Sequence, residues 1–365
     1  MYPFELAVLR SLSATQKRQL VQTMGSAEAV LESREEELLD TGLINEQVIK
    51  HLREERAGRN FKEEYADYKK AGYGIVSLED REYPELLRQI PDPPYGIFYI
   101  GTLPGKEEQM IAMVGARRCS SYGRTAATEL ARYLAEQGFS IVSGMALGID
   151  GASHTGALEA SGRTYAFLAC GPDICYPRAN YKLYRAIPEH GALMSEFPPG
   201  VAPVARFFPS RNRLISGISR AVLVMEARKR SGSLITADQA LEQGRDVYAL
   251  PGRISDVMSE GCNHLIAQGA MIIQSRETLL SDLTELPVGN MKIEIDTQFN
   301  ELHLEKEELL VYSCFDFYAK GVDEVQQEVG LDLLTLLSII LKLCEMGCLK
   351  EVFQNQYIRV ASIFH

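Results

Sequence analysis

The middle of the chain alternates short apolar runs with stretches in which apolar residues recur at helical spacing. The first unit of this kind covers residues 110–154. An apolar run ends at Gly115, apolar residues then return every three or four positions until Gly138, and a second apolar run fills 139–143. This pattern predicts a strand, a helix and a second parallel strand, with a glycine-containing loop after each strand.

The same rhythm continues to residue 273 and predicts a mostly parallel α/β sheet. The predicted strands are 110–114, 139–143, 164–169, 192–196, 220–226, 246–250 and 270–273. The predicted helices are 122–137, 151–160, 179–187, 208–217, 233–243 and 259–268. Ligands of such sheets bind outside the carboxyl ends of the strands, so we expect the loops after these strands to form one binding edge.

The segments on either side of this sheet follow other patterns. Residues 1–70 carry helical spacing throughout and predict a small helical bundle, whereas the segment that follows mixes short strands with prolines and predicts an added sheet edge. Near the end, three helical stretches (305–317, 322–329 and 331–345) and a hairpin-like terminus predict a winged-helix arrangement. The predicted domains are therefore 1–70, 71–275 and 296–365, with a linker at 276–295.

The composition is that of a globular protein, with 46% apolar residues. The apolar runs are shorter than the ~18 residues that a membrane span needs, and the N-terminus lacks the layout of a signal peptide. We therefore expect a cytoplasmic protein without membrane contact. The seven cysteines contain no Cys-x-x-Cys pair, which favours reduced thiols over disulfides or zinc.

The net charge of −11 conceals a basic region. Residues 111–230 hold fifteen Lys and Arg against eight Asp and Glu, whereas residues 275–365 hold seven against sixteen. A basic face on an acidic protein is consistent with a polyanionic ligand, although cations scattered over solvated helices would give the same count. The last predicted helix offers Lys342 as its one cation, so it is a poor candidate for reading a DNA groove.

The first loop of the sheet is the leading candidate for anion binding. Arg117, Arg118 and Arg124 lie around a helix N-terminus, where free N–H groups and the helix dipole favour phosphate. The chain has neither a Walker A motif nor Gly-x-Gly-x-x-Gly, which disfavours nucleotide hydrolysis and dinucleotide redox chemistry. Acidic residues and a histidine near the rim lack the spacing of a catalytic or metal site, so we predict no metal and no cofactor. These residues are Asp150, His154, Glu196 and Glu226.

Two further basic segments border the same predicted edge. From Arg206 to Arg230 the chain has seven Lys and Arg residues and a single acidic residue, Glu226. Lys182 and Arg185 lie one helical turn apart among tyrosines, and cations mixed with aromatic rings are typical of a groove for single-stranded nucleic acid. Packing of these tyrosines in the core is the alternative.

Several motifs in this order carry a resemblance: VGARRCSSYG, SGMALGIDGASHTGAL, ACGPDICYPRANYKL, FFPSRNRLISGISRAVLVMEA and SGSLITADQALEQGRDVYALPG. The chain closely resembles the bacterial DNA processing protein A family, also called DprA or Smf. The resemblance implies an extended Rossmann-like core, usually homodimeric, that binds and protects single-stranded DNA without catalysis and loads the RecA recombinase, in natural transformation where that occurs. It also implies a sterile-alpha-motif-like N-terminal domain and a winged-helix C-terminal domain.

The resemblance also implies a DNA-binding set. Arg117 and Lys182 resemble the key cations of the family, and Asn212 with its flanking arginines matches a third contact region. The full predicted set is Gly115, Arg117, Arg118, Ser120, Tyr122, Ser143, Gly144, Lys182, Tyr184, Arg185, Ser210, Arg211, Asn212 and Arg213.

Two alternatives stay open at this point. Phosphoribohydrolases that resemble lysine decarboxylases share a glycine loop and a cationic rim, with an acidic residue such as Glu226 as the catalytic group. Their PGGxGT signature is absent, since the corresponding stretch is RSGSLITADQALEQG. The third hypothesis is a protein scaffold that acts through its acidic ends and binds no DNA.

Overall fold

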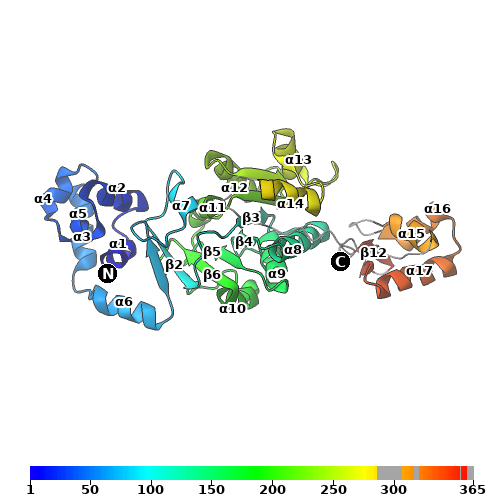
Figure 1. Cartoon of the computed structure of the whole chain (residues 1–365), viewed down its shortest axis with the longest axis horizontal. Coiled ribbons are helices and arrows are strands. Elements are labelled where there is room, and N and C mark those ends of the chain that lie inside the picture. Colours follow the sequence, from blue (N-terminus) through cyan, green and yellow to red (C-terminus); the bar gives the residue numbers. More distant parts are fainter. Residues whose placement is uncertain (286–305, 316–319, 354, 360–365) are drawn as a thin grey trace.

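The computed structural model describes residues 1–285, 306–315, 320–353 and 355–359. The N-terminal part is helical, as predicted. Side chains of Ser13, Ser26, Asn45 and Asn60 cap four of the helices by accepting hydrogen bonds from backbone N–H groups. The helices are α1 (Tyr2–Val8), α2 (Ala14–Met24), α3 (Ala27–Glu32), α4 (Glu35–Asp40), α5 (Glu46–Arg56) and α6 (Phe61–Lys70) (Figure 1).

A nine-stranded sheet forms the centre of the protein, in the order β1-β2-β6-β5-β4-β3-β7-β8-β9. All neighbours from β6 to β9 in this order are parallel. The strands are β1 (Gly74–Ser77), β2 (Gly96–Gly101), β3 (Met110–Gly115), β4 (Ser140–Ser143), β5 (Thr164–Phe167), β6 (Gly191–Ser195), β7 (Ala221–Glu226), β8 (Asp246–Ala249) and β9 (Met271–Ile272). The predicted mostly parallel α/β sheet is confirmed.

Strands β1 and β2 join the sheet in antiparallel orientation and form its edge, as expected for this segment. They also connect the sheet to the N-terminal helices. Tyr95 and Phe98 belong to the same buried cluster as Phe4, Leu6 and Leu20 of those helices. The N-terminal helices therefore pack directly on the sheet edge.

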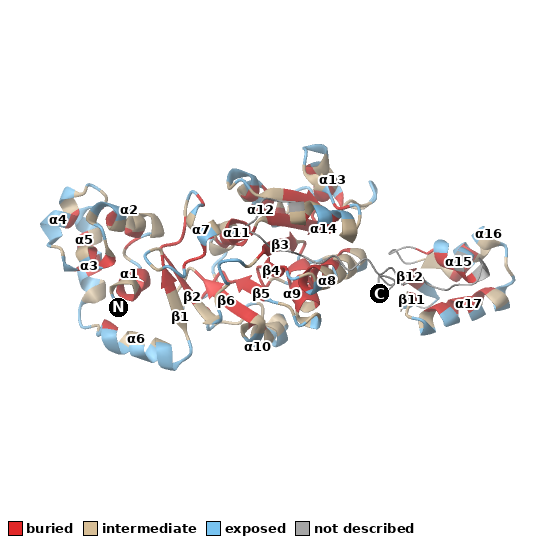
Figure 2. Cartoon of the chain, in the orientation of Figure 1, coloured by how far each residue is buried: buried red, intermediate tan, exposed pale blue. Residues whose placement is uncertain are grey.

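Helices cover both faces of the sheet (Figure 1). The alternation along β3 shows the two faces, because Ile111 and Met113 belong to one buried cluster while Ala112 and Val114 belong to the other. Figure 2 shows the buried residues concentrated in the strands and on the inner sides of the helices. Burial on both faces explains why the strands read as continuous apolar runs in the sequence.

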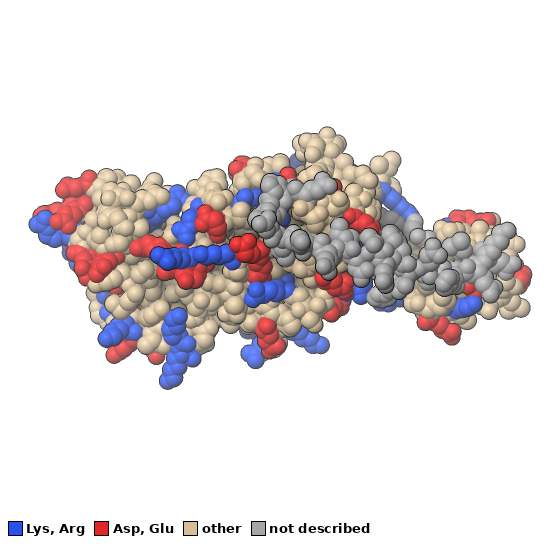
Figure 3. Space-filling view, viewed as in Figure 1, with Lys and Arg blue, Asp and Glu red and all other residues tan. Residues whose placement is uncertain are grey.

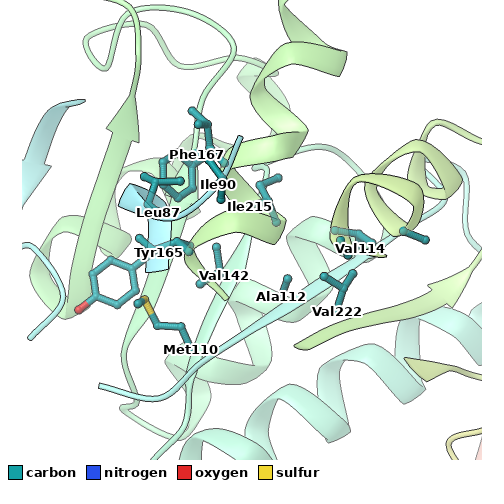
Figure 4. Close-up of a cluster of buried hydrophobic side chains, with 14 of the residues drawn as sticks. Leu87, Ile90, Met110, Ala112, Val114, Val142, Tyr165, Phe167, Ile215 and Val222 are labelled. Atoms are coloured by element: carbon teal, nitrogen blue, oxygen red, sulfur yellow. The ribbon is translucent and has the colours of Figure 1, made fainter. Parts of the chain in front are cut away.

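One face packs against α7 (Glu85–Arg88), α11 (Phe207–Ile218), α12 (Gly232–Glu242) and α13 (Glu260–Ala267). Figure 4 shows part of this cluster, with Leu87 and Ile90 of the α7 segment, Ile215 of α11, and Tyr165 and Phe167 of β5. The other face packs against α8 (Ser121–Glu136), α9 (Ile149–Glu159), α10 (Tyr181–His190) and α14 (Arg276–Glu285).

Helix α14 occupies residues for which the sequence predicted a linker. Leu279, Leu280 and Leu283 are at most 1% exposed and belong to the cluster that α8 and the sheet form. The predicted boundary of the central domain at residue 275 therefore lies about ten residues before the end of α14. It was placed there because three leucines alone do not continue the strand–helix alternation. The remainder of the predicted linker, 286–295, lies outside the described residues.

The C-terminal part contains three helices and a small sheet with the order β10-β12-β11. Its elements are α15 (Lys306–Ser313), β10 (Lys320–Gly321), α16 (Val322–Val329), α17 (Leu333–Glu345), β11 (Leu349–Phe353) and β12 (Gln356–Arg359). The helices and the β11–β12 hairpin lie where the sequence placed them. A winged helix stays the prediction for this unit. Lys342, the one cation of α17, forms an ion pair with Glu308, so it is poorly placed to contact a phosphate.

None of the helices in the described parts of the chain is long and apolar enough to span a membrane. All seven cysteines lie in these parts, and none is paired in a disulfide. Neither finding assigns a function.

His154 is a buried residue whose protonation links the stability of the fold to pH. Its ring is fully buried, and Nδ1 lies 2.7 Å from the Thr164 hydroxyl, which itself donates to the Ile141 carbonyl. Because the hydroxyl proton is already used, Nδ1 carries the proton in the neutral ring. Burial lowers the pKa of His154 to about 3, and the positive charge of Arg211 acts in the same direction.

We expect this histidine to destabilise the fold at low pH. Below an unfolded-state pKa of 6.5 the unfolded chain binds a proton that the folded ring excludes, so stability is lost as the pH falls. Between pH 7 and pH 5 the contribution is about 2 kcal/mol. Urea unfolding of wild type and His154→Gln at both pH values measures it. Equal pH dependence of the two proteins would contradict the assignment.

Candidate nucleic-acid interface

A groove of about 700 Å³ opens at the carboxyl ends of the central strands. The chain runs from β3 through β4 and β5 to β6 on one side and continues from β7 on the other, so the strand order reverses between β3 and β7. Loops diverge at such a point and leave a crevice, which is where parallel sheets bind ligands. We call this crevice the switch groove; residues that line it include Gly115, Arg117, Arg118, Asp150, Tyr176, Phe208, Arg211, Asn212, Arg228 and Arg230.

The loop after β3 supplies the central cation of the switch groove. Arg117 and Arg118 are exposed and line the groove. The guanidinium carbon of Arg117 lies 5.0 Å from the centroid of the Phe208 ring, within the range of a cation–π contact. This contact orients the guanidinium while its N–H groups stay available, so Arg117 can donate to a phosphate.

Two aromatic rings lie beside this cation. Phe208, at the start of α11, and Tyr176, in the loop after β5, have ring centroids 5.8 Å apart. Tyr176 is 45% exposed and both residues line the switch groove. Neither belonged to the predicted DNA-binding set, although both lie in motifs that the sequence singled out. Rings beside an exposed guanidinium provide surfaces on which bases can stack.

Arg228 and Arg230 add two exposed cations to the lining of the groove. They follow β7 and precede α12, where the hydroxyl of Ser231 accepts a hydrogen bond from the Ser233 N–H. The N-terminus of this 11-residue helix therefore faces the groove with its positive dipole end. Both arginines belong to a basic segment that the sequence analysis identified, but neither was in the predicted DNA-binding set.

Arg211 is buried, whereas the sequence predicted that it contacts DNA. Its side chain is 4% exposed, and Nη1 donates to the carbonyl oxygens of Gly144 at 2.5 Å and Phe167 at 2.6 Å. Burial lowers the pKa of Arg211 to about 10, while the charge of Asp150 opposes this shift. Arg211 forms the floor of the switch groove and fixes the ends of β4 and β5.

Gly144 provides the space that this buried arginine needs. A Cβ atom at Gly144 would lie 2.2 Å from Nη1 of Arg211. The N–H groups of Gly144 and Ala146 donate to the carboxylate of Asp150 in the first turn of α9, and the Ser143 hydroxyl donates to Met113 O at 2.6 Å. Gly144 and Ser143, both predicted to contact DNA, therefore hold the strand ends together.

Arg213 is held in ion pairs within the protein. Its guanidinium forms ion pairs with Glu196 at 2.9 Å and Asp92 at 3.3 Å, and only 12% of its side chain is exposed. The carbonyl of Ser210 accepts a further hydrogen bond from Arg213. Of the four predicted residues from 210 to 213, Asn212 is the one that faces the groove with a partly exposed side chain, and its Nδ2 lies 3.5 Å from Gly232 O.

Ser120 and Tyr122, both predicted to contact DNA, have hydrogen-bond partners within the protein. The Ser120 N–H donates to Glu226 Oε2 at 2.8 Å, its hydroxyl bonds the same carboxylate, and its Oγ caps α8 by accepting from the Gly123 N–H. The Tyr122 hydroxyl donates to Pro251 O. These contacts shape the loop that carries Arg117.

Glu226 at the end of β7 is 1% exposed and does not line the switch groove. A Cβ at Gly123 would lie 2.3 Å from its carboxyl carbon, so the glycine makes room for this contact. Burial raises the pKa of Glu226, while the hydrogen bonds from Ser120 oppose the rise. Glu226 thus stabilises the loop, and this geometry gives no support to a catalytic carboxylate at this position.

Lys182, Tyr184 and Arg185 lie together on α10 but do not line the switch groove. Lys182 and Arg185 are exposed, whereas the Tyr184 hydroxyl donates to Pro172 O at 2.6 Å. The exposed ring on this helix is that of Tyr181, stacked on Tyr184 with centroids 6.5 Å apart. This α10 patch is connected to the groove through the short segment that follows Tyr176.

The face drawn in Figure 3 carries Lys and Arg side chains mixed with Asp and Glu. The cations of the switch groove, in contrast, come from the loop after β3, the loop after β7 and helix α11, which meet at one edge of the sheet. Asp150 is the carboxylate among the lining residues, and it is buried beside Arg211. The groove is therefore locally basic in a protein of net charge −11.

Comparisons with known proteins agree with this architecture. The family model of DNA recombination-mediator protein A matches residues 74–284. The DNA processing protein DprA of Streptococcus pneumoniae is 43% identical over 206 residues, which cover 56% of this chain and 73% of that protein. The X-ray structure of DprA from Streptococcus pneumoniae aligns with a TM-score of 0.68 and 34% identity over 77% of this chain and 98% of that chain.

A second solved structure concerns DNA processing protein A from Helicobacter pylori and its single-stranded DNA binding mode. It aligns with a TM-score of 0.53 and 29% identity, and covers 58% of this chain and 96% of that chain. The residues that the family model matches include all nine strands of the central sheet and the residues that line the switch groove. The chain belongs to the family of DNA recombination-mediator protein A.

Proposed function

We propose that this protein binds single-stranded DNA in the switch groove, without sequence preference, and acts as a recombination mediator. The observation that carries the proposal is the arrangement of Arg117 over Phe208 beside the exposed Tyr176 ring. A guanidinium neutralises phosphate, and the rings accept bases of any identity. The single-stranded DNA binding that the Helicobacter pylori structure describes supports this choice of ligand.

The chemistry of the groove favours a single strand over a duplex. Aromatic rings can stack only on bases that are not already paired and stacked within a helix. Asn212 is the amide that lines the groove, and the remaining polar groups there are mainly cationic, so discrimination between bases is expected to be weak. Lys182 and Arg185 of the α10 patch would contact further phosphates of the same strand.

A salt titration tests the electrostatic part of this proposal. With four to six phosphate contacts, the logarithm of the binding constant should fall with the logarithm of salt concentration with a slope of about −3 to −4. Fluorescence anisotropy of a labelled oligo-dT measures this slope. A slope near zero would show that cations do not hold the strand, and it would contradict the proposal.

The finer parts of the function follow from the family. We propose that the bound strand is protected and passed to a RecA-type recombinase, which recombinase assembly on covered single strands would test. We also propose a homodimer through the region of α12 and β9. Leu241 is 61% exposed and Ile272, on the last strand of the sheet, is 39% exposed. Light scattering of wild type and Ile272→Arg would test the dimer.

A further inference from the structure

A second cavity lies where the N-terminal helices meet the sheet, on the other side of the segment that contributes Phe208 to the switch groove. Its volume is about 400 Å³. Residues between α1 and α2 form one wall, and the segment after β6 forms the other. We call it the junction pocket; residues that line it include Arg10, Ser13, Lys17, Tyr95, Glu196, Phe197, Arg206 and Phe207.

Lys17 places a buried positive charge in the junction pocket. The residue is 8% exposed, and its ammonium donates one hydrogen bond, to Ala7 O at 2.8 Å. Among the residues that the structure describes, no carboxylate lies within ion-pair distance of this ammonium, and the charges of Glu55 and Glu196 act on it from farther away. An ammonium has three N–H donors, and a buried charge without a counter-ion is unfavourable. Burial lowers the pKa of Lys17 to about 8, while the charges of Glu55 and Glu196 oppose this shift.

Other groups in the pocket add to the positive potential. Arg10 and Arg206 are exposed at its rim. Ser13, the N-cap residue of α2, lies in the pocket wall, so the positive end of this 11-residue helix faces the same space. The acidic residue in the lining, Glu196, is already bound by Arg213 through two hydrogen bonds. The pocket therefore has an excess of cations that an anionic ligand would neutralise.

The same pocket contains aromatic rings. Phe197 and Phe207 have ring centroids 4.2 Å apart, and the guanidinium of Arg206 lies 5.3 Å above Phe207. A cation stacked on a ring beside a phosphate-sized positive site repeats the chemistry of Arg117 and Phe208. Such a combination fits a nucleotide, which presents a phosphate and a flat base together.

One short segment contributes to both sites. Ala205 and Phe208 line the switch groove, while Arg206 and Phe207 line the junction pocket. Four consecutive residues thus divide their side chains between the two cavities. A DNA strand that contacts Phe208 would therefore need to pass only the backbone of residues 205–208 to reach Phe207.

We propose that the junction pocket binds a nucleotide of the same single strand that occupies the switch groove, with its phosphate at Lys17 and Arg206 and its base against Phe207. This inference rests on the proposed function. It makes the N-terminal helices part of the DNA-binding surface and predicts that the binding site is longer than the switch groove alone.

The absence of tryptophan from the chain permits a direct test. Phe208→Trp and Phe207→Trp each yield a protein with a single indole, in the switch groove and the junction pocket respectively. Stacking of a thymine on either indole should quench its fluorescence. We expect short oligo-dT to quench the indole of Phe208→Trp alone, and longer oligo-dT to quench the indole of both variants.

The outcomes separate the two proposals. Quenching in Phe208→Trp but not in Phe207→Trp with every oligonucleotide length would overturn the junction pocket and leave the proposed function intact. Lack of quenching in both variants would overturn the proposed function itself. Thymidine monophosphate and inorganic phosphate serve as further probes. If either bound to the junction pocket as tightly as the long oligonucleotide, the pocket would hold a free ligand rather than a strand, and the inference would be wrong.

Affinity measurements provide a second test. Lys17→Met and Arg206→Ala should each weaken the binding of a long oligo-dT about five- to tenfold and reduce the salt slope by about 0.7, whereas binding of a short oligo-dT should not change. Arg206 is exposed, so its variant is expected to fold even if Lys17→Met does not. Lys50→Ala, an exposed lysine of α5, is the matched control and should bind like wild type. Equal effects on short and long oligonucleotides would contradict the inference.

Discussion

Arg117→Ala should weaken the binding of oligo-dT about ten- to hundredfold. This range follows from the ~1.5–3 kcal/mol that a hydrogen bond to a charged group contributes. Arg117 is exposed and is oriented by the Phe208 ring, so its loss removes a phosphate contact and leaves the ring without its cation. The salt slope should fall by about 0.7, because one fewer counter-ion is released per bound strand. Anisotropy titrations at several salt concentrations measure both effects.

Arg124→Ala is the matched control for this prediction. Arg124 is an exposed arginine in the first turns of α8 and does not line the switch groove. Its loss changes the net charge by the same amount but should reduce affinity less than about twofold. If both variants lost affinity equally, general attraction rather than the groove would hold the strand. Unchanged affinity of Arg117→Ala would contradict the site directly.

Arg211→Met should cost about 3–5 kcal/mol of unfolding free energy. The substitution leaves the carbonyl oxygens of Gly144 and Phe167 without their donor and leaves Asp150 buried without its nearby positive charge. Urea unfolding followed by circular dichroism measures the loss. DNA affinity per folded molecule should change far less than in Arg117→Ala, because the Arg211 guanidinium is directed into the protein.

Arg230→Ala is the control, for which we expect the opposite of Arg211→Met: unchanged stability and weaker DNA binding. Arg230 is exposed in the groove wall, so its substitution should leave stability within about 0.5 kcal/mol of wild type and weaken DNA binding. If Arg211→Met instead kept full stability and lost DNA binding, Arg211 would be a phosphate ligand. The sequence prediction for Arg211 would then be right, and its role as the floor of the groove would be wrong.

The sequence predicted the sheet well for a physical reason. Strands buried on both faces must be apolar at every position, and the runs that became β3 and β7 could be identified without knowledge of their neighbours. Because all parallel strands direct their carboxyl ends to one edge, the meeting of the loops that carry Arg117 and Arg230 could also be predicted.

The sequence could not separate the roles of neighbouring residues in the motif around Arg211. Successive side chains of a helix point about 100° apart, so Arg211, Asn212 and Arg213 face different surroundings on α11. Arg211 points to the ends of β4 and β5, and Arg213 points to Glu196. Only the packed structure shows which of the three faces the groove.

The hydrogen-bond partner of Ser120 could not be predicted from the sequence either. Glu226 follows it by 106 residues, and nothing in the local sequence connects the two. The sequence analysis did not select Phe208 for a related reason. A phenylalanine at the start of a helix is expected to pack in the core, and only the structure shows its contact with Arg117. The long-range contacts of the folded chain, rather than local patterns, distinguish structural from ligand-binding residues in this protein.

The most direct test of single-strand binding is an equilibrium competition on the wild-type protein. A labelled oligo-dT is bound, and unlabelled single strand, duplex of equal length and thymidine monophosphate are titrated as competitors. We predict that the single strand displaces the label at the lowest concentration, the duplex at a clearly higher one, and the mononucleotide only at the highest concentrations. Displacement by duplex as effective as that by single strand would contradict a groove that binds unpaired bases.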